Sequence, residues 1–364
     1  MIYLDYQATT PLAPEALEAM LPWLTADGSA NPHSSHVAGR AAKAAVEIAR
    51  EQVAALLPPG GRVIFTSGAT EAANWAIKGA IGTGGVVLPD TEHACVRDTG
   101  MFLGQCGHDV TILPVDAEGL VDSKAPIAPG TSIVATMLVN NEIGVVQPIA
   151  EIADAAHAAG ALFFCDAVQG YGKVPIPGNC DMIALSGHKI HGPKAIGALW
   201  VRDGVNLEPL MHGGGQEAGL RSGTLSPALC AGFGAAAGIA AQRMVDDAEH
   251  VETLWHAALA QLGRGWLLNG SATQRYYGNL NIRHPGLDAA RLISELRNVA
   301  FSAGSACASG SGRPSHVLTA LGLSRAEAQS SIRIGYGRYT TRDELVDAVD
   351  LIMAAAKRQT EMAG

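Results

Sequence analysis

Short apolar runs alternate along this chain with longer segments in which alanine and other apolar residues recur every three or four positions. The runs are typical of buried strands, and they predict strands at residues 62–65, 86–88, 132–136, 161–165, 181–185 and 198–201. Between them, the helical period predicts helices at residues 39–57, 70–79 and 149–159. Strands that alternate with helices favour an α/β domain with a mostly parallel sheet.

The pattern changes in the last third of the chain. A long alanine-rich helical stretch follows Pro227, and from about Asp247 we expect longer helices and fewer strands. A second domain is therefore predicted to begin near this point.

The composition is typical of a soluble globular protein, with 48% hydrophobic and 16% charged residues among 364. The net charge is -9 and no block of Lys and Arg is present, so we do not expect nucleic-acid binding. Residues 1–6 do not resemble a signal peptide, and the apolar run at residues 229–241 is too short to cross a bilayer. We expect a cytoplasmic protein without a membrane segment.

The 6 cysteines are dispersed, with no CxxC pair and no His/Cys cluster at metal-ligand spacing. We therefore expect neither disulfides nor a metal site. Cys307 lies in residues 302–312, which are otherwise only Gly, Ser and Ala. Because such a segment has little apolar surface to pack, the Cys307 thiol is expected to be accessible and mobile.

Polar residues follow several predicted strands, where ligands bind in open α/β sheets. Lys189 follows the strand at residues 181–185 in a Ser-Gly-His-Lys turn and suits a Schiff base with an aldehyde cofactor. Ser186 and His188 in the same turn suit the cofactor phosphate. Residues 66–71 lead from a strand into a helix whose first amides also suit a phosphate, although an ordinary helix N-cap explains the same residues.

Three more residues fit a pyridine cofactor. Asp166 closes an apolar strand and suits a pyridinium nitrogen, with Gln169 one turn further along near the ring hydroxyl; a helix N-cap is the alternative for Asp166. His93 suits stacking on the ring and proton transfer near neutral pH, or else is a loop histidine without a role. Asn141 suits the cofactor hydroxyl or the substrate, but paired asparagines also mark turns. Their occurrence together favours a cofactor site.

Longer motifs resemble a known family over nearly the whole chain. In order, they are YLDYQATTP, NPHSSH, SGATEA, NNEIGVVQP, DAVQGYGKVP, SGHKIHGPK, GGGQEAGLRSGT, SAGSACASG and SIRIGYGRYTT. They resemble the cysteine desulfurases of the NifS/IscS type, pyridoxal 5'-phosphate enzymes of class V with fold type I. The resemblance implies a large α/β domain (residues 13–246) with a mostly parallel mixed sheet. It also implies a smaller α+β domain (residues 1–12 with 247–364) that carries a mobile cysteine loop at about residues 302–312.

The resemblance also implies a role for each candidate residue. Lys189 binds the cofactor aldehyde, Asp166 the pyridine nitrogen and Gln169 the phenolic oxygen, while His93 stacks on the ring. The implied ligands of the phosphate are Ala69, Thr70, Ser186, His188 and, from the neighbouring subunit, Thr224. That last assignment implies a homodimer. Arg333 and Asn141 are implied to bind the substrate, since the planar fork of Arg suits a carboxylate.

The implied reaction converts L-cysteine to L-alanine. The released Lys189 takes the α-proton, and the Cys307 thiolate takes the substrate sulfur as a persulfide. An acceptor protein or a reductant then receives the sulfur, with iron–sulfur cluster assembly and tRNA thiolation as two candidate destinations. A same-fold aminotransferase or selenocysteine lyase, or a non-catalytic scaffold that keeps the fold, is the alternative.

Some positions depart from the family pattern. His191 and Ala195 stand where the family usually has Tyr and Gly, Ala218 replaces a frequent Arg, and Ala303 a common Gly. These residues flank the chemistry, so they bear on substrate fit, loop movement or partner contacts. We expect no counterpart of the long C-terminal extension with which housekeeping members dock a scaffold protein, so the resemblance does not identify the sulfur acceptor.

Overall fold

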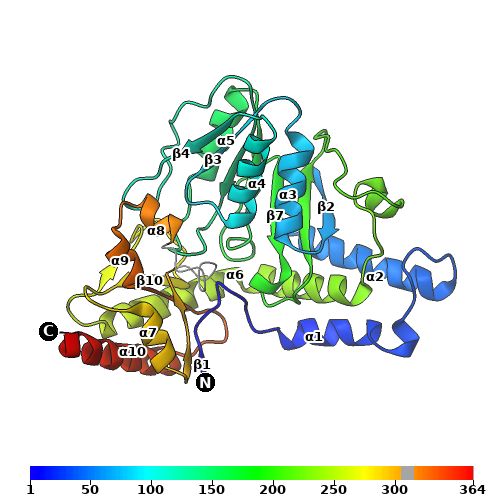
Figure 1. Ribbon diagram of the computed structural model, residues 1–364. Coiled ribbons are helices and arrows are strands. Elements are labelled where there is room, and N and C mark those ends of the chain that lie inside the picture. The colour runs from blue at the N-terminus through cyan, green and yellow to red at the C-terminus, as the bar shows by residue number, and fades with distance from the viewer. Residues whose placement is uncertain (305–314, 364) are drawn as a thin grey trace.

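A seven-stranded sheet forms the centre of the larger part of the molecule (Figure 1). The computed structural model describes residues 1–304 and 315–363. The strand order is β2-β8-β7-β6-β5-β3-β4. Every neighbouring pair is parallel except the two pairs made by β8, which confirms the mostly parallel sheet. The strands are β2 (Gly61–Thr66), β3 (Gly85–Pro89), β4 (Val110–Leu113), β5 (Thr131–Met137), β6 (Leu162–Asp166), β7 (Met182–Ser186) and β8 (Gly197–Arg202).

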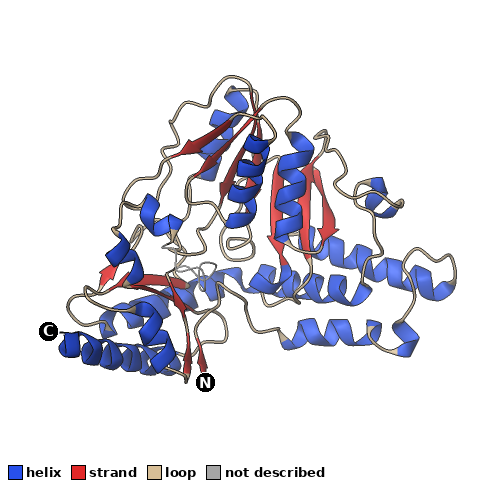
Figure 2. Ribbon diagram, viewed as in Figure 1, coloured by secondary structure: helices blue, strands red, loops and turns tan. Residues whose placement is uncertain are grey.

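Helices cover both faces of this sheet (Figure 2). They include α2 (Val37–Ala54), α3 (Ala69–Ala80), α4 (Ala94–Gln105) and α5 (Ile149–Ala158). Successive residues of β6 serve different faces: Phe163 packs in the core with α2 and α5, and Phe164 packs in the core with α3 and α4. Because both faces are covered, the central strands are continuous apolar runs, which made them recognisable in the sequence.

A second core lies beside the first, near both termini (Figure 1). Its four-stranded sheet has the order β12-β13-β10-β9, and a second, two-stranded sheet pairs β1 with β11. These strands are β1 (Ile2–Tyr3), β9 (Leu267–Leu268), β10 (Asn279–Arg283), β11 (Val299–Ala300), β12 (Ser302–Ala303) and β13 (Ser331–Gly335). The helices are α7 (Ala289–Glu295), α8 (His316–Ala320), α9 (Arg325–Gln329) and α10 (Arg342–Ala363).

The expectation of longer helices and fewer strands after Asp247 was wrong for much of this region. Helices α7, α8 and α9 have only 7, 5 and 5 residues, and strands β9 to β13 lie in the same part of the chain. Strand β10 was missed because it carries buried asparagines. Asn281 is hidden but hydrogen-bonded to the carbonyl of Glu142, so the strand is not an apolar run.

Helix α6 (Pro227–Gln261, 35 residues) joins the two cores. Phe233 packs in the core of the large sheet, whereas Leu254 and Trp255 pack in the second core. The boundary predicted at residue 247 falls inside this helix and stays a prediction. The apolar run at residues 229–241, expected to be too short to cross a bilayer, is part of α6, which by length and composition alone qualifies as a membrane span.

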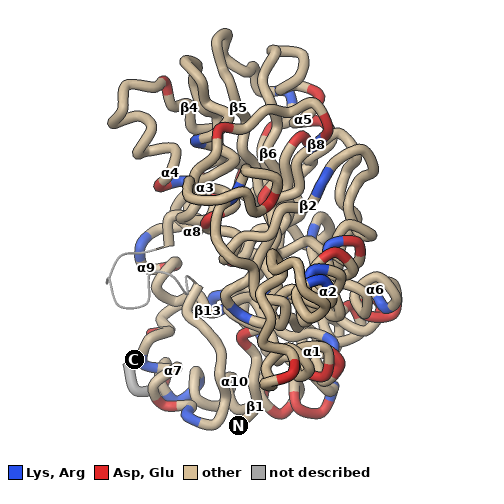
Figure 3. Tube along the Cα trace, turned by 90° about the vertical axis from the view of Figure 1, so that its right-hand side faces the viewer, with Lys and Arg blue, Asp and Glu red and all other residues tan. Residues whose placement is uncertain are grey.

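Helix α1 (Pro14–Met20) packs against α6 at the end opposite the second core (Figure 1). Lys and Arg are interspersed with Asp and Glu along the chain and do not gather in one stripe on the face in Figure 3.

Candidate active site

A cavity of about 620 Å³ lies at the carboxyl ends of the central strands of the large sheet. Residues predicted from the sequence line it: Ala69, Thr70, His93, Asn141, Asp166, Gln169, Ser186, His188, Lys189 and Arg333. They come from segments far apart in the chain, so the fold itself gathers them.

Lys189 ends the short 3-10 helix Gly187–Lys189, directly after β7. Its Nζ donates to the backbone carbonyls of Gln7 at 2.5 Å and Ala8 at 2.8 Å. Gly187 lets the turn pack closely, since a Cβ there would lie 3.0 Å from the Pro193 carbonyl oxygen. The amine is therefore fixed at the cavity wall by the N-terminal segment.

Asp166 closes β6 and is buried at the cavity floor. Burial raises the pKa of its carboxyl, while the charge of His93, the Val168 N–H and the charge of Lys189 act in the opposite direction. The Val168 N–H donates to Oδ1 at 3.0 Å, and the following residues form a turn, so Asp166 is not the N-cap of a helix. A cationic ring nitrogen beside this carboxylate would compensate its burial.

Glu92 is a second buried carboxyl group near this floor. Burial, followed by the charge of Asp166, raises the pKa of Glu92 well above its usual range. Its Oε1 accepts from the Met137 N–H at 2.7 Å. Two neighbouring carboxyls do not both ionise easily in a dry site, and of the two the pKa of Glu92 is raised further than that of Asp166.

His93 is the N-cap residue of α4 and lines the cavity, so it is not a loop histidine without a role. Its Nδ1 lies 3.2 Å from the Cys95 backbone nitrogen and 3.1 Å from the Cys95 Sγ. Gln169 donates from Nε2 to the Gln7 carbonyl at 2.9 Å. No local sequence signal indicates that Gln7 or Cys95 lines this site.

The N-terminus of α3 forms another part of the wall. Its N-cap is Gly68, which has no side chain to cap the helix, so the ordinary Ser/Thr N-cap expected as the alternative is wrong. A Cβ on Gly197 would lie 2.8 Å from the Gly68 backbone, so glycine allows β8 to approach this turn. Uncapped amides at the positive end of a helix fit a phosphate group.

His188 and Ser186 also line the cavity. Burial, and secondly the charge of Lys189, lowers the pKa of His188 to about 4. Its Nδ1 lies 3.1 Å from the Thr9 Oγ1. A neutral imidazole here can donate one N–H to an anion. The donor set therefore fits the phosphate of a pyridoxal cofactor.

Arg333 lies on β13 of the second sheet and is only 1% exposed. Its Nη2 lies 2.8 Å from the Asp5 Oδ1, and Nη1 donates to the Asn141 carbonyl at 2.9 Å. Its Nε has no hydrogen-bond partner among the described residues. A buried guanidinium with an unsatisfied donor beside a cavity suits a carboxylate ligand.

Of the two paired asparagines, one forms the turn and the other lines the cavity. Asn140 accepts the Glu142 and Ile143 N–H groups at its Oδ1, at 2.8 and 3.0 Å, and so forms the turn. Asn141 lines the cavity. The turn thus places Asn141 between the large sheet and Arg333.

Two predicted residues, Thr224 and Cys307, are not among the described residues that line this cavity. Thr224 is exposed and does not line it in its own chain. Cys307 lies outside the described residues. Of the departures from the family pattern, His191, Ala195 and Ala218 have left-handed backbones, with φ of 69°, 63° and 57°, and Ala303 lies in β12.

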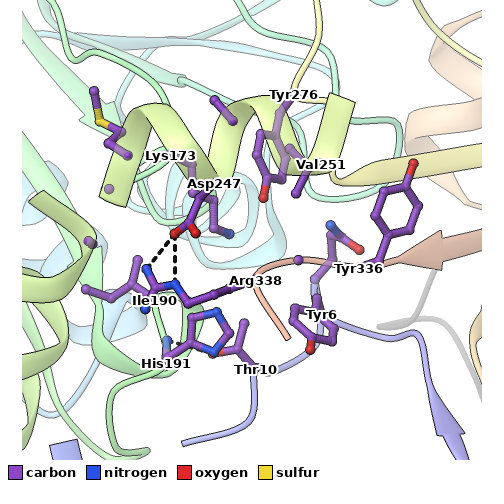
Figure 4. A pocket seen from close by; sticks show the side chains of 16 residues that line it. Tyr6, Thr10, Lys173, Ile190, His191, Asp247, Val251, Tyr276, Tyr336 and Arg338 are labelled. Carbon is purple, nitrogen blue, oxygen red and sulfur yellow. Dashed lines mark hydrogen bonds and ion pairs between the residues drawn. The ribbon is translucent and has the colours of Figure 1, made fainter. Parts of the chain in front are cut away.

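A second, smaller cavity of about 30 Å³ lies between the two cores, with Lys173, Tyr276 and Arg338 on its walls (Figure 4). Arg338 forms an ion pair with Asp247, with Nη2 2.7 Å from Oδ2. Four buried polar atoms of its lining residues lack a hydrogen-bond partner among the described residues: Gln7 Oε1, Asp247 Oδ1, Tyr336 OH and Arg338 Nη1. Water ordinarily satisfies such atoms, and the volume suffices for at least one molecule.

Lys173 is the least expected residue of this second cavity. Its Nζ lies 5.3 Å from the ring centroid of Tyr276, and no carboxylate pairs with it among the described residues. Burial, and secondly the charge of Lys189, lowers the pKa of Lys173 to about 7. The sequence did not single it out because nothing local distinguishes it from a surface lysine.

Comparison with known proteins agrees with this geometry. The family model described as Aminotransferase class-V matches residues 2–349. The protein named cysteine desulfurase IscS of Rickettsia felis is 45% identical, over 99% of this chain and 92% of its own length.

Solved structures of similar proteins agree with this family assignment. A structure titled NifS-like protein superposes with a TM-score of 0.89 at 31% identity, covering 97% of this chain and 99% of the other. One titled SspA in complex with cysteine gives a TM-score of 0.83 at 38% identity, covering 94% and 100%.

Proposed function

Because the chain belongs to the class-V aminotransferase family, we infer that it is a pyridoxal 5'-phosphate-dependent cysteine desulfurase, which takes sulfur from L-cysteine and leaves L-alanine. The observation that carries this function is that Lys189 and Asp166 line one cavity. The chemistry of a pyridoxal cofactor requires an amine at its aldehyde and a carboxylate at its ring nitrogen.

When bound, the cofactor supplies an aldehyde for the substrate amine and a ring that withdraws electrons from the bonds around the substrate α-carbon. We propose that Asp166 holds the ring nitrogen and that His93 lies against the ring. The phosphate ligands in this proposal are Ala69, Thr70, Ser186 and His188.

Lys189 is proposed to bind the cofactor and then to move the substrate α-proton. Its amine is anchored by the Gln7 and Ala8 carbonyls, which limits its motion to the cavity wall. An amine so placed removes and returns a proton without crossing bulk water.

Arg333 and Asn141 are proposed to bind the substrate carboxylate. The Arg333 guanidinium is held from two sides by Asp5 and the Asn141 carbonyl, so it meets the substrate already oriented. Cys307 is the proposed sulfur acceptor: its thiolate would bond to the substrate sulfur as the substrate Cβ–S bond breaks, which gives a persulfide. The electrons of the broken bond stay on the substrate carbon, which is protonated to give alanine.

The activity is tested by incubating the purified protein with L-cysteine and a reductant and measuring alanine and sulfide. We expect both products from the wild type and neither at the wild-type rate from Cys307→Ala. Absence of alanine from the wild type contradicts the function. Wild-type sulfide release by Cys307→Ala removes that thiol from the mechanism and favours an aminotransferase or lyase that does not need it.

We also propose a homodimer in which Thr224 of each subunit reaches the phosphate in the other. The exposure of Thr224 supports this. Exposed apolar residues also support it: Leu17 on α1, Leu21 directly after α1, and Val37 and Ile48 on α2. The molar mass in solution is measured by light scattering. A monomer with full cofactor occupancy contradicts the proposal.

The persulfide sulfur is proposed to pass to an acceptor protein, in iron–sulfur cluster assembly or tRNA thiolation. The first step is tested with L-cysteine labelled in its sulfur. We expect label on the chain that a reductant removes and that Cys307→Ala does not acquire.

A further inference from the structure

Cys95 lies beside His93 in the wall of the main cavity. His93 is the N-cap of α4, and its Nδ1 accepts the backbone N–H of Cys95 at 3.2 Å. The Sγ of the same cysteine lies 3.1 Å from the same nitrogen. Two potential donors of one residue thus converge on one ring atom.

The backbone contact fixes which nitrogen carries the proton. A backbone N–H is always a donor, so Nδ1 must offer its lone pair to it. A neutral imidazole has one ring proton, which is then on Nε2. Moving the proton to Nδ1 would set two donors against each other and remove the cap of α4.

The Cys95 thiol also favours the form of His93 with its proton on Nε2. Burial raises the pKa of the Cys95 thiol, and the hydrogen bond to His93 only partly opposes this. The sulfur therefore keeps its proton near neutral pH and acts as a weak S–H donor. Nδ1 of His93, 3.1 Å away, is within hydrogen-bond distance of this sulfur.

We propose that Cys95 is a positioning residue for His93: its N–H and thiol together hold Nδ1 as an acceptor and keep the ring proton on Nε2. His93 then presents an N–H donor from Nε2, and it takes up a further proton only by giving up both contacts. The tautomer is a property of the protein itself, and only its effect on turnover rests on the desulfurase function.

The test is NMR of the full-length holoenzyme with nitrogen-15-labelled histidine, using His93→Gln to assign the His93 signals. We expect an unprotonated Nδ1 and a protonated Nε2. In Cys95→Ala the backbone donor stays and the thiol is lost, so the pH midpoint of the His93 signals should rise by about half a unit. Cys95→Ser supplies a hydroxyl donor and should restore the wild-type midpoint.

The matched control is Cys106→Ala. Cys106 is exposed at the other end of α4, so this variant should leave the midpoint unchanged. A proton on Nδ1 in the wild type, or the same midpoint in Cys95→Ala as in the wild type, overturns the proposal. The pH profile of alanine formation should move in the same direction as the NMR midpoint. If the protein forms no alanine, the desulfurase function fails while the NMR result still decides the role of Cys95.

Discussion

Lys189 and Gln169 donate to the same acceptor, the backbone carbonyl of Gln7, at 2.5 and 2.9 Å. The Gln7 side chain in turn donates from Nε2 to the Gly278 carbonyl at 2.8 Å. One residue of the N-terminal segment therefore links the proposed cofactor lysine, the proposed ring ligand and the second core. Disturbing residues near the N-terminus should therefore alter the chemistry of Lys189.

Replacing Arg333 by Lys should raise the KM for L-cysteine by about 10- to 100-fold, because an ammonium cannot make the planar, bidentate contact of a guanidinium. The steady-state rates of alanine formation measure this change. Asp5→Asn is the matched control: it weakens the 2.8 Å ion pair but keeps the guanidinium, so its effect on KM should be smaller. An unchanged KM in Arg333→Lys would remove this residue from substrate binding.

Ala195→Gly should stabilise the protein by about 0.5–1 kcal/mol. Ala195 has φ of 63°, where a Cβ costs about 1–2 kcal/mol, and the greater chain entropy of glycine in the unfolded state offsets part of that gain. Denaturant unfolding measures the difference. Ala117→Gly, at an exposed position with no positive φ, is the control and should not stabilise. A less stable Ala195→Gly would show that the Cβ makes a favourable contact.

Glu142 should make the protein less stable as the pH rises. Burial raises the pKa of Glu142 to about 7, while a 2.5 Å hydrogen bond from Ser315 and the charges of Arg333 and His93 oppose the shift. Between about pH 4.5 and 7 the folded state binds a proton that the unfolded state has lost. Stability should fall through that window, by about 3 kcal/mol in total, and then level off.

Glu142→Gln should flatten this part of the curve of unfolding free energy against pH. Glu118→Gln, at an exposed position, is the control and should leave the slope as in the wild type. Parallel curves for the wild type and Glu142→Gln would mean that Glu142 titrates normally.

Lys173→Met should stabilise the protein most at and below pH 7. The pKa of Lys173 is lowered to about 7, so between about pH 7 and 10 the unfolded state binds a proton that the folded state lacks. Wild-type stability therefore rises with pH through this window. Allowing for solvent screening of a half-buried side chain, we expect a gain of about 2 kcal/mol at pH 7 that fades towards pH 10.

The melting temperature against pH measures this effect. Lys124→Met, at an exposed position, should not depend on pH in this way. If Lys173→Met gives the same gain at every pH, the effect comes from apolar packing and not from the ammonium.

The large sheet was predictable because its strands are covered on both faces and are therefore continuous apolar runs. The edge strand β4 was missed, since only Leu113 of its four residues is buried. In the second core, β10 was missed because it carries Asn279 and Asn281, whose Nδ2 groups donate to the distant carbonyls of Asn141 and Glu142. No local sequence pattern indicates a strand that buries asparagine.

The candidate site was predictable where motifs end strands, as at Asp166 and Lys189. Asp5 and Gln7 were missed, because each reaches the site from far away in the chain: Asp5 lies 328 residues from Arg333, and Gln7 lies 182 residues from Lys189. Cys95 was missed because its role depends on the rotation of one imidazole ring. Such contacts exist only once the fold has formed.

Helix α6 passes unbroken from one core to the other over 35 residues, so the number of residues between its ends fixes how the two halves face each other. Inserting a single residue near its middle would turn everything after it by about 100° and advance it by about 1.5 Å. Arg333 lies after the helix and Lys189 before it, so such an insertion would set the two side chains on different faces. The length of α6 therefore determines whether Lys189 and Arg333 can line the same cavity.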